Sequence, residues 1–289
     1  SGVREAAGMR RLAAFACTLV ILAACSDGGS DGSSATSDSP TTVVMTSVAT
    51  TTAATAPATT EVVTPTTTPA TTTTEPAAPY AATIDDLLAI GRPIVLAHTA
   101  GEDQFPASTL YGFGESVKAG VDMLDLNVLL TKDGVLVIQH DDTVDRSTNG
   151  RGAVAELTYD EIAALDDAYW FTTDCGACTG RPEADYLYRG IRTGDRPPPA
   201  GYVPDDFAIP TFRQLVERFP DIPLNVEIKG TGDAARAAAD QLLIELDDLG
   251  RADASVVASF DDEIVSYFHS IAPDIEVSPG LGVLTAYVL

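Results

Sequence analysis

Short apolar runs alternate along the chain with segments of helical character. Runs rich in Val, Ile and Leu predict strands at 93–97, 123–128, 135–138, 224–228, 255–260 and 275–278. Helix-like segments lie between most of them, at 109–119, 158–165, 211–219, 234–249 and 261–271. Thr158 and Thr211 stand where helix N-caps are expected. Alternation of this kind implies a parallel sheet, in either a doubly wound sheet or a β/α barrel.

Polar side chains gather at the carboxyl ends of four of these predicted strands. The set comprises His98, Asp125, Asn127, His140, Asn225, Glu227 and Lys229. Taken singly, each also has a structural reading, as a buried histidine with satisfied hydrogen bonds, a helix-capping carboxylate or a solvated lysine. In a β/α barrel the carboxyl ends of the strands converge on one mouth, where active sites lie. The sequence therefore predicts one pocket that holds two histidines, oxygen donors and a lysine.

One long motif surrounds the second histidine. It runs from Leu130-Thr131-Lys132-Asp133-Gly134-Val135-Leu136-Val137 into His140-Asp141-Asp142-Thr143-Val144-Asp145-Arg146-Ser147-Thr148-Asn149-Gly150. Shorter motifs are Val226-Glu227-Ile228-Lys229, Ile209-Pro210-Thr211 and Ser259-Phe260. On these motifs, most of residues 90–280 resemble the glycerophosphodiester phosphodiesterase family.

The resemblance implies a TIM-type (β/α)8 barrel and a chemistry. The family hydrolyses phosphodiesters to glycerol 3-phosphate and an alcohol, and it uses a divalent cation, typically Ca²⁺ or Mg²⁺. By resemblance, the site residues are His98 and His140 as the catalytic pair, Asp125, Asn127 and Glu227 as metal ligands, and Lys229 at the phosphate. One imidazole would accept a proton from the attacking hydroxyl, and the other would protonate the leaving alkoxide.

Three departures from the family pattern fall close to these residues. Thr99-Ala100 replaces the usual Arg-Gly, so Lys229 or Arg146 is expected to contact the phosphate instead. Pro106-Ala107-Ser108-Thr109 replaces Pro-Glu-Asn-Thr, and Asp125-Leu126-Asn127 replaces Glu-Leu-Asp. The third departure, Asn127 in place of an aspartate, lowers the number of metal carboxylates from three to two, which weakens cation affinity. Two alternatives therefore stay open, a catalytically inactive binding lipoprotein and a phospholipase D-like activity on intact lipids.

The N-terminal segment predicts export from the cytoplasm. Arg10 and Arg11 precede an apolar run at 12–24, and the chain then reads Leu22-Ala23-Ala24-Cys25, like a bacterial lipobox. We expect residues 1–25 to be a signal peptide with Cys25 lipidated. An ordinary secretory signal with a chance cysteine stays the alternative. The protein would be lipid-anchored to the outer face of the bacterial cell membrane.

A Thr- and Pro-rich stretch separates the predicted signal peptide from the folded domain. Threonine supplies 17 of the 34 residues from 41 to 74, without a period that could bury a core. We expect residues 26–84 to be a disordered linker and 85–289 to form the barrel domain. The chain stops near the sixth predicted strand, so we expect a partial barrel with about six of eight strands.

Net charge restricts the binding partners to be expected, and the cysteine content restricts the role of the cysteine pair. The chain has 42 acidic and 17 basic side chains, a net charge of −25, which argues against nucleic acid and against docking on anionic lipid. We expect a small-molecule phosphodiester as the partner, a membrane contact through the lipid anchor only, and see no protein partner in the sequence. Cys175 and Cys178 lack the further ligands that zinc needs, so we expect a local disulfide in the long insertion between Trp170 and Pro210.

Overall fold

The computed structural model describes residues 80–288. The predicted signal peptide, Cys25 and most of the predicted linker lie outside these residues. The strands are β1 (Leu96–Ala97), β2 (Met123–Leu130), β3 (Leu136–Ile138), β4 (Phe171–Thr172), β5 (Gly176–Ala177), β6 (Leu224–Ile228), β7 (Ser255–Ala258) and β8 (Glu276–Val277). The α-helices are α1 (Ile84–Leu88), α2 (Leu110–Ala119), α3 (Tyr159–Ala163), α4 (Phe212–Arg218), α5 (Gly232–Asp248), α6 (Asp262–Ile271) and α7 (Leu281–Val288).

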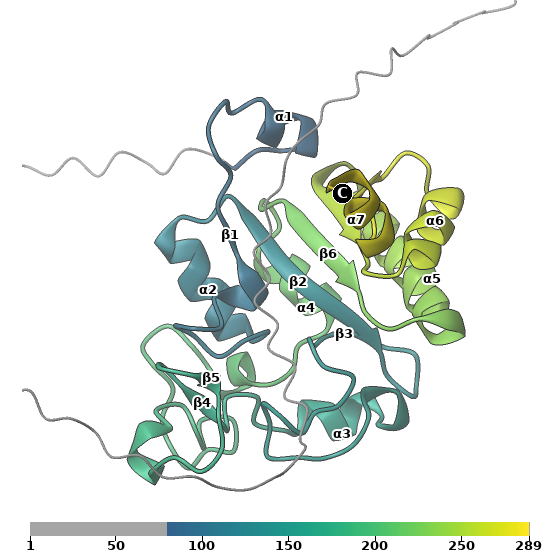
Figure 1. The fold of residues 1–289 in the computed structure, drawn as a ribbon. Coiled ribbons are helices and arrows are strands. Elements are labelled where there is room, and N and C mark those ends of the chain that lie inside the picture. The colour runs from purple at the N-terminus through teal and green to yellow at the C-terminus, as the bar shows by residue number, and fades with distance from the viewer. Residues whose placement is uncertain (1–79, 289) are drawn as a thin grey trace, which may run out of the picture. The chain divides into compact units, whose positions relative to one another are not determined.

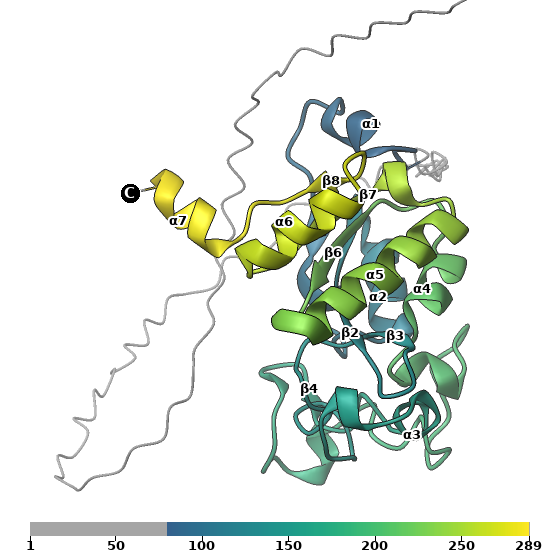
Figure 2. The same ribbon diagram turned by 90° about the vertical axis from the view of Figure 1, so that its right-hand side faces the viewer.

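Five strands form a parallel sheet in the order β1-β2-β6-β7-β8, as Figures 1 and 2 let the reader follow. Apart from the excursion that carries β3, β4 and β5, strand order in space follows chain order, as it does around a β/α barrel. A closed barrel of this type has eight parallel strands, and residues 80–288 supply five of them. The predicted fold class, an incomplete β/α barrel, is confirmed.

The third predicted strand differs from the prediction in direction. β3 pairs antiparallel with the end of β2, with Leu130 opposite Leu136. Five residues separate these two positions, which is enough for a hairpin and too few for the crossover that a parallel neighbour requires. β3 is therefore the sixth strand of the sheet, as predicted, but it runs antiparallel as an arm that extends β2.

Side-chain caps mark where α2, α3, α4 and α6 begin. Thr109, Thr158, Thr211 and Asp261 each accept a backbone N–H from the first turn of the following helix. Thr158 and Thr211 also complete capping boxes with the third helical residue. None of the helices between residues 80 and 288 combines the length and the apolar character that crossing a bilayer needs.

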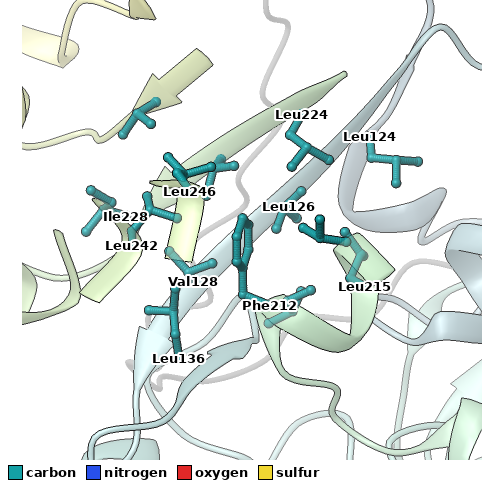
Figure 3. Packing of buried hydrophobic residues seen from close by; sticks show 14 of the residues in the cluster. Leu124, Leu126, Val128, Leu136, Phe212, Leu215, Leu224, Ile228, Leu242 and Leu246 are labelled. Atoms are coloured by element: carbon teal, nitrogen blue, oxygen red, sulfur yellow. The ribbon is translucent and has the colours of Figure 1, made fainter. Parts of the chain in front are cut away.

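The principal core lies between the parallel sheet and the helices α2, α4, α5 and α6. Figure 3 shows Phe212 of α4 and Leu242 of α5 pointing toward the same apolar layer as Leu126 and Val128 of β2. All four side chains are fully buried. Because β2 and β6 are covered on this face, their opposite face can carry polar groups without interrupting the core.

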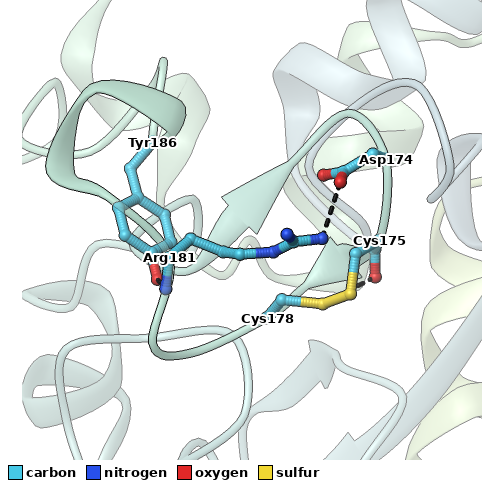
Figure 4. Close-up of a disulfide and its surroundings, with 5 residues drawn as sticks. All are labelled: Asp174, Cys175, Cys178, Arg181 and Tyr186. Carbon is cyan, nitrogen blue, oxygen red and sulfur yellow. Dashed lines mark hydrogen bonds and ion pairs between the residues drawn. A yellow bond between two sulfur atoms is a disulfide. The ribbon is translucent and has the colours of Figure 1, made fainter. Parts of the chain in front are cut away.

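The insertion between α3 and α4 forms a separate small unit. β4 and β5 pair as an antiparallel hairpin, and Cys175 and Cys178, which flank β5 on either side, form a disulfide (Figure 4). Arg181 donates to Asp174 at 2.6 Å beside the disulfide. A second apolar cluster, including Tyr111 and Phe207, attaches the insertion to α2.

Candidate active site

The polar face of β2 and β6 is built from two crossed acid–amide pairs. The parallel register places Asp125 opposite Asn225 and Asn127 opposite Glu227. Asn225 Nδ2 donates to Asp125 Oδ1 at 2.5 Å, and Asn127 Nδ2 donates to Glu227 Oε2 at 2.8 Å. Each carboxylate thus receives a hydrogen bond from an amide on the neighbouring strand, which fixes both side chains on this face.

His98 lies directly after β1, in a turn with unusual backbone geometry. Thr99 and Ala100 have φ values of 42° and 71°, a region that residues with a Cβ rarely adopt. The His98 Nδ1 donates to Glu102 Oε1 at 2.7 Å. The backbone N–H of Thr99 hydrogen-bonds to Asp125, which ties this turn to β2.

His140 follows β3 and has a carboxylate partner of its own. Its Nδ1 donates to Asp141 Oδ1 at 2.7 Å. Arg146 holds the same carboxylate through Nε at 2.5 Å and Nη2 at 3.1 Å. The imidazole therefore has its Nδ1 side fixed, and Nε2 is the nitrogen left for the pocket.

The two histidines, from different strands, face one another across the site. Their ring centroids lie 6.3 Å apart at a nearly perpendicular angle. Lys229 follows β6, and its Nζ lies 3.3 Å from His140 Nε2 and 3.2 Å from Glu227 Oε1. The predicted convergence of residues 98, 140, 227 and 229 is thus present in the structure.

An open pocket of about 640 Å³ lies beside these residues. Its lining includes His140, Asp141, Glu227, Lys229 and Phe260. The predicted residues His98, Asp125, Asn127 and Arg146 do not line it. Arg146 instead pairs with Asp141, so a direct contact between Arg146 and phosphate stays a prediction.

The surroundings of the ionisable groups shift their protonation in different directions. The hydrogen bond between His98 and Glu102 raises the pKa of His98 and lowers the pKa of Glu102. Burial raises the pKa of Asp125. Burial alone would also raise the pKa of Asp141, but the hydrogen bonds from His140 and Arg146 hold it well below its usual range.

The three predicted metal ligands offer oxygen atoms suited to a hard cation. Among residues 80–288, no three His, Cys, Asp or Glu side chains converge as a metal cluster, and the predicted ligand set contributes two carboxylates, Asp125 and Glu227. The third donor is an amide: Asn127 Oδ1 is buried and lacks a hydrogen-bond partner within the described chain. Its side-chain amide N–H donates a hydrogen bond to Glu227, so its amide oxygen remains available as a metal ligand. Asp125, Asn127 and Glu227 therefore fit a Ca²⁺- or Mg²⁺-type ion.

Sequence reasoning missed the two carboxylates that hold the histidines. Asp141 directly follows His140, and that adjacency was the available signal. Glu102 lies four residues after His98, a spacing that means contact on a helix but not in a loop. Only the positive φ values of Thr99 and Ala100 bring it onto the ring.

A partial β/α barrel with a histidine pair and oxygen donors on adjoining parallel strands defines the class of protein. The chain belongs to the glycerophosphoryl diester phosphodiesterase family, whose sequence model matches residues 98–282. It is 44% identical over 75 residues to a glycerophosphodiester phosphodiesterase of Caldanaerobacter subterraneus, covering 26% of this chain and 31% of that protein. It is 26% identical over 195 residues to one of Bacillus altitudinis, covering 68% of this chain and 67% of that one.

Solved structures show the same fold. A glycerophosphoryl diester phosphodiesterase domain from Mycobacterium tuberculosis has a TM-score of 0.53 at 24% identity, covering 67% of this chain and 62% of that chain. An Oleispira antarctica phosphodiesterase, solved with its product sn-glycerol-3-phosphate, has a TM-score of 0.50 at 22% identity over 64% of each chain. The chain thus spans about a third to two thirds of the length of these relatives.

Proposed function

We propose that the protein hydrolyses glycerophosphodiesters to glycerol 3-phosphate and an alcohol. The observation that carries the proposal is the meeting of His98 and His140, 6.3 Å apart, beside the Lys229 ammonium. The reaction needs one group that accepts a proton and one that donates a proton on opposite sides of a phosphorus atom. Family membership supports this assignment and restricts it to phosphodiesters.

The two imidazoles suit different steps. His140 receives a hydrogen bond from Lys229 at Nε2, so in this arrangement Nε2 carries a lone pair and can accept the proton of an attacking hydroxyl. Glu102 raises the pKa of His98, so His98 keeps its proton to higher pH. The protonated ring is suited to protonate the leaving alkoxide.

Charge on the phosphate must be balanced in an acidic pocket. Lys229, only 15% exposed at its side chain, is the cation in the pocket lining. A Ca²⁺ or Mg²⁺ ion held by Asp125, Asn127 and Glu227 would supply the remaining positive charge against the phosphoryl oxygens. Glu227 would then be a ligand of the cation, and the Lys229 ammonium, now 3.2 Å from its Oε1, would be available to contact the phosphate.

The test is release of glycerol 3-phosphate from glycerophosphocholine, with Ca²⁺ or Mg²⁺ and with chelator. We expect metal-dependent turnover that falls by about 10²-fold or more in His140→Ala. His269→Ala is the matched control, because His269 is exposed on α6 away from the site. Turnover of intact phosphatidylcholine instead would support the phospholipase D-like alternative. Binding of glycerophosphocholine without turnover would support the inactive binding lipoprotein.

Lipidation at Cys25 anchors the protein to the outer face of the cell membrane. The basic pair before an apolar run and the lipobox support this location. Cys25→Ala, expressed in a bacterium, is expected to move the protein out of the membrane fraction. Cys17→Ala, inside the same apolar run, is the control and is expected to leave fractionation unchanged. Membrane retention of the Cys25 variant would contradict the anchor.

A further inference from the structure

Glu102 is an ionisable residue that contacts His98 at the site, and no sequence motif singles it out. Its Oε1 accepts from His98 Nδ1 at 2.7 Å. Its side chain is 34% exposed, whereas that of His98 is 60% exposed. An exposed histidine ring has several rotamers open to it, so the carboxylate contact is what selects one.

The backbone between the two residues is folded back to make this contact. The His98 carbonyl accepts from the N–H of Gly101 at 2.7 Å and from that of Glu102 at 3.3 Å. The turn passes through positive φ at Thr99 and Ala100, and each costs about 1 kcal/mol for a residue with a Cβ. Strain of this kind persists where surrounding contacts enforce it, often at functional sites.

The disulfide hairpin packs against the same turn. A Cβ added to Gly176 of β5 would lie 3.2 Å from the carbonyl oxygen of Glu102, and Gly176 has a φ of 65°. The missing side chain lets the hairpin approach the Glu102 backbone closely. The disulfide joins the residues on either side of β5, so the segment that contacts the Glu102 backbone is covalently constrained.

We propose that Glu102 is a positioning residue that fixes the ring and the tautomer of His98. It accepts the Nδ1 proton and thereby leaves Nε2 as the nitrogen that exchanges a proton with substrate. Its catalytic consequence rests on the proposed phosphodiesterase function. The charged and titratable groups that face His98 are Glu102 from its own turn, Asp125 of β2, Lys229 after β6 and His140 after β3. Of these, the structure gives only Glu102 a hydrogen bond to the His98 ring.

Three variants separate positioning from general charge. Glu102→Ala removes the acceptor, and Glu102→Gln keeps an oxygen acceptor without the charge. Asp103→Asn removes the same charge one residue away, on an exposed side chain of the same turn. The full chain has three histidines, so ¹⁵N-histidine labelling gives three spin systems, and His98→Ala identifies the one from His98.

The measurement is the ¹⁵N shift pattern of neutral His98 at alkaline pH, followed by its titration. We expect the Nδ1–H tautomer in the parent protein, in Glu102→Gln and in Asp103→Asn. In Glu102→Ala we expect a shift toward the Nε2–H tautomer, which a free histidine side chain prefers. The midpoint of the His98 titration falls in both Glu102 variants and stays in place in Asp103→Asn.

An unchanged tautomer in Glu102→Ala, or an equal change in Asp103→Asn, would overturn the proposal. In kinetic assays kcat is expected to fall by about 10- to 100-fold in Glu102→Ala and less in Glu102→Gln, with KM changing little. If the parent protein releases no glycerol 3-phosphate, the proposed function fails, while the NMR measurement still decides the role of Glu102.

Discussion

His98 and His140 are the same residue type in two different settings. His98 is 60% exposed at its side chain and is held by one carboxylate, whereas His140 is 29% exposed and Arg146 anchors its carboxylate partner, Asp141. Lys229 donates to Nε2 of His140. Because their surroundings differ, the two imidazoles are expected to take different steps of the reaction rather than exchange roles.

Ser108 marks a second strained position near the site. Its φ is 58°, its side chain is buried and its Oγ lacks a hydrogen-bond partner among the described residues. Ser108→Gly removes the strain and the unsatisfied hydroxyl, against a smaller entropic cost. We expect the free energy of unfolding to rise by about 1 kcal/mol, measured by denaturant unfolding.

A second buried serine provides the control. Ser116 Oγ donates to the Ala100 carbonyl at 2.9 Å, so Ser116→Ala is expected to lower the free energy of unfolding by about 1 kcal/mol. A loss of stability in Ser108→Gly comparable to that in Ser116→Ala would contradict the account of strain.

Asp167 makes the free energy of unfolding depend on pH. Burial raises its pKa to about 8, against the hydrogen bond that Ser147 donates to it at 2.5 Å. The folded state therefore keeps a proton that the unfolded state loses near pH 4, so the free energy of unfolding falls as pH rises from about 4 to about 8. Asp167→Asn cannot ionise, and its unfolding curve should lose this slope. Equal pH slopes in urea unfolding of the two proteins would rule out the shift.

At the scale of elements, the sequence predicted the helices more closely than the strand directions. Thr109, Thr158 and Thr211 cap helices that were predicted to begin at these residues, because a capping side chain signals a start locally. The direction of β3 depends on how a five-residue turn closes, and apolar content alone does not report it.

Two glycines of α2 test how tightly the helix packs. A Cβ on Gly112 would lie 2.5 Å from the Pro106 carbonyl oxygen, and one on Gly114 would lie 2.6 Å from the Tyr202 hydroxyl. Helix propensity alone predicts that alanine stabilises both positions by about 1 kcal/mol. We expect Gly112→Ala to destabilise the protein, since a backbone carbonyl must move.

Gly114→Ala is the matched case, because the end of a tyrosine side chain can shift. It is expected to cost less than Gly112→Ala when the two are compared by thermal unfolding. A gain of stability in Gly112→Ala would show that helix propensity outweighs packing in α2.

At the scale of the whole molecule, the sequence predicted which polar residues converge but not how they pair. Residues 98, 125, 127, 140, 227 and 229 were predicted from their places at strand ends. The parallel strands β1, β2 and β6 carry or precede all of them except His140, which follows the antiparallel strand β3. The crossed pairs of Asp125 with Asn225 and Asn127 with Glu227 follow from strand register. Register is set by packing across the whole sheet, so no local pattern encodes it.

In the proposed reaction, His98 and His140 act as one acid–base unit on a phosphodiester. The most direct measurement is kcat/KM for glycerol 3-phosphate release by the single alanine variants and by the double variant. The effects of residues that act as a unit are strongly non-additive, so we expect the double variant to be about as slow as either single variant. Single-variant losses that multiply in the double variant, or a single variant with undiminished kcat/KM, would contradict it.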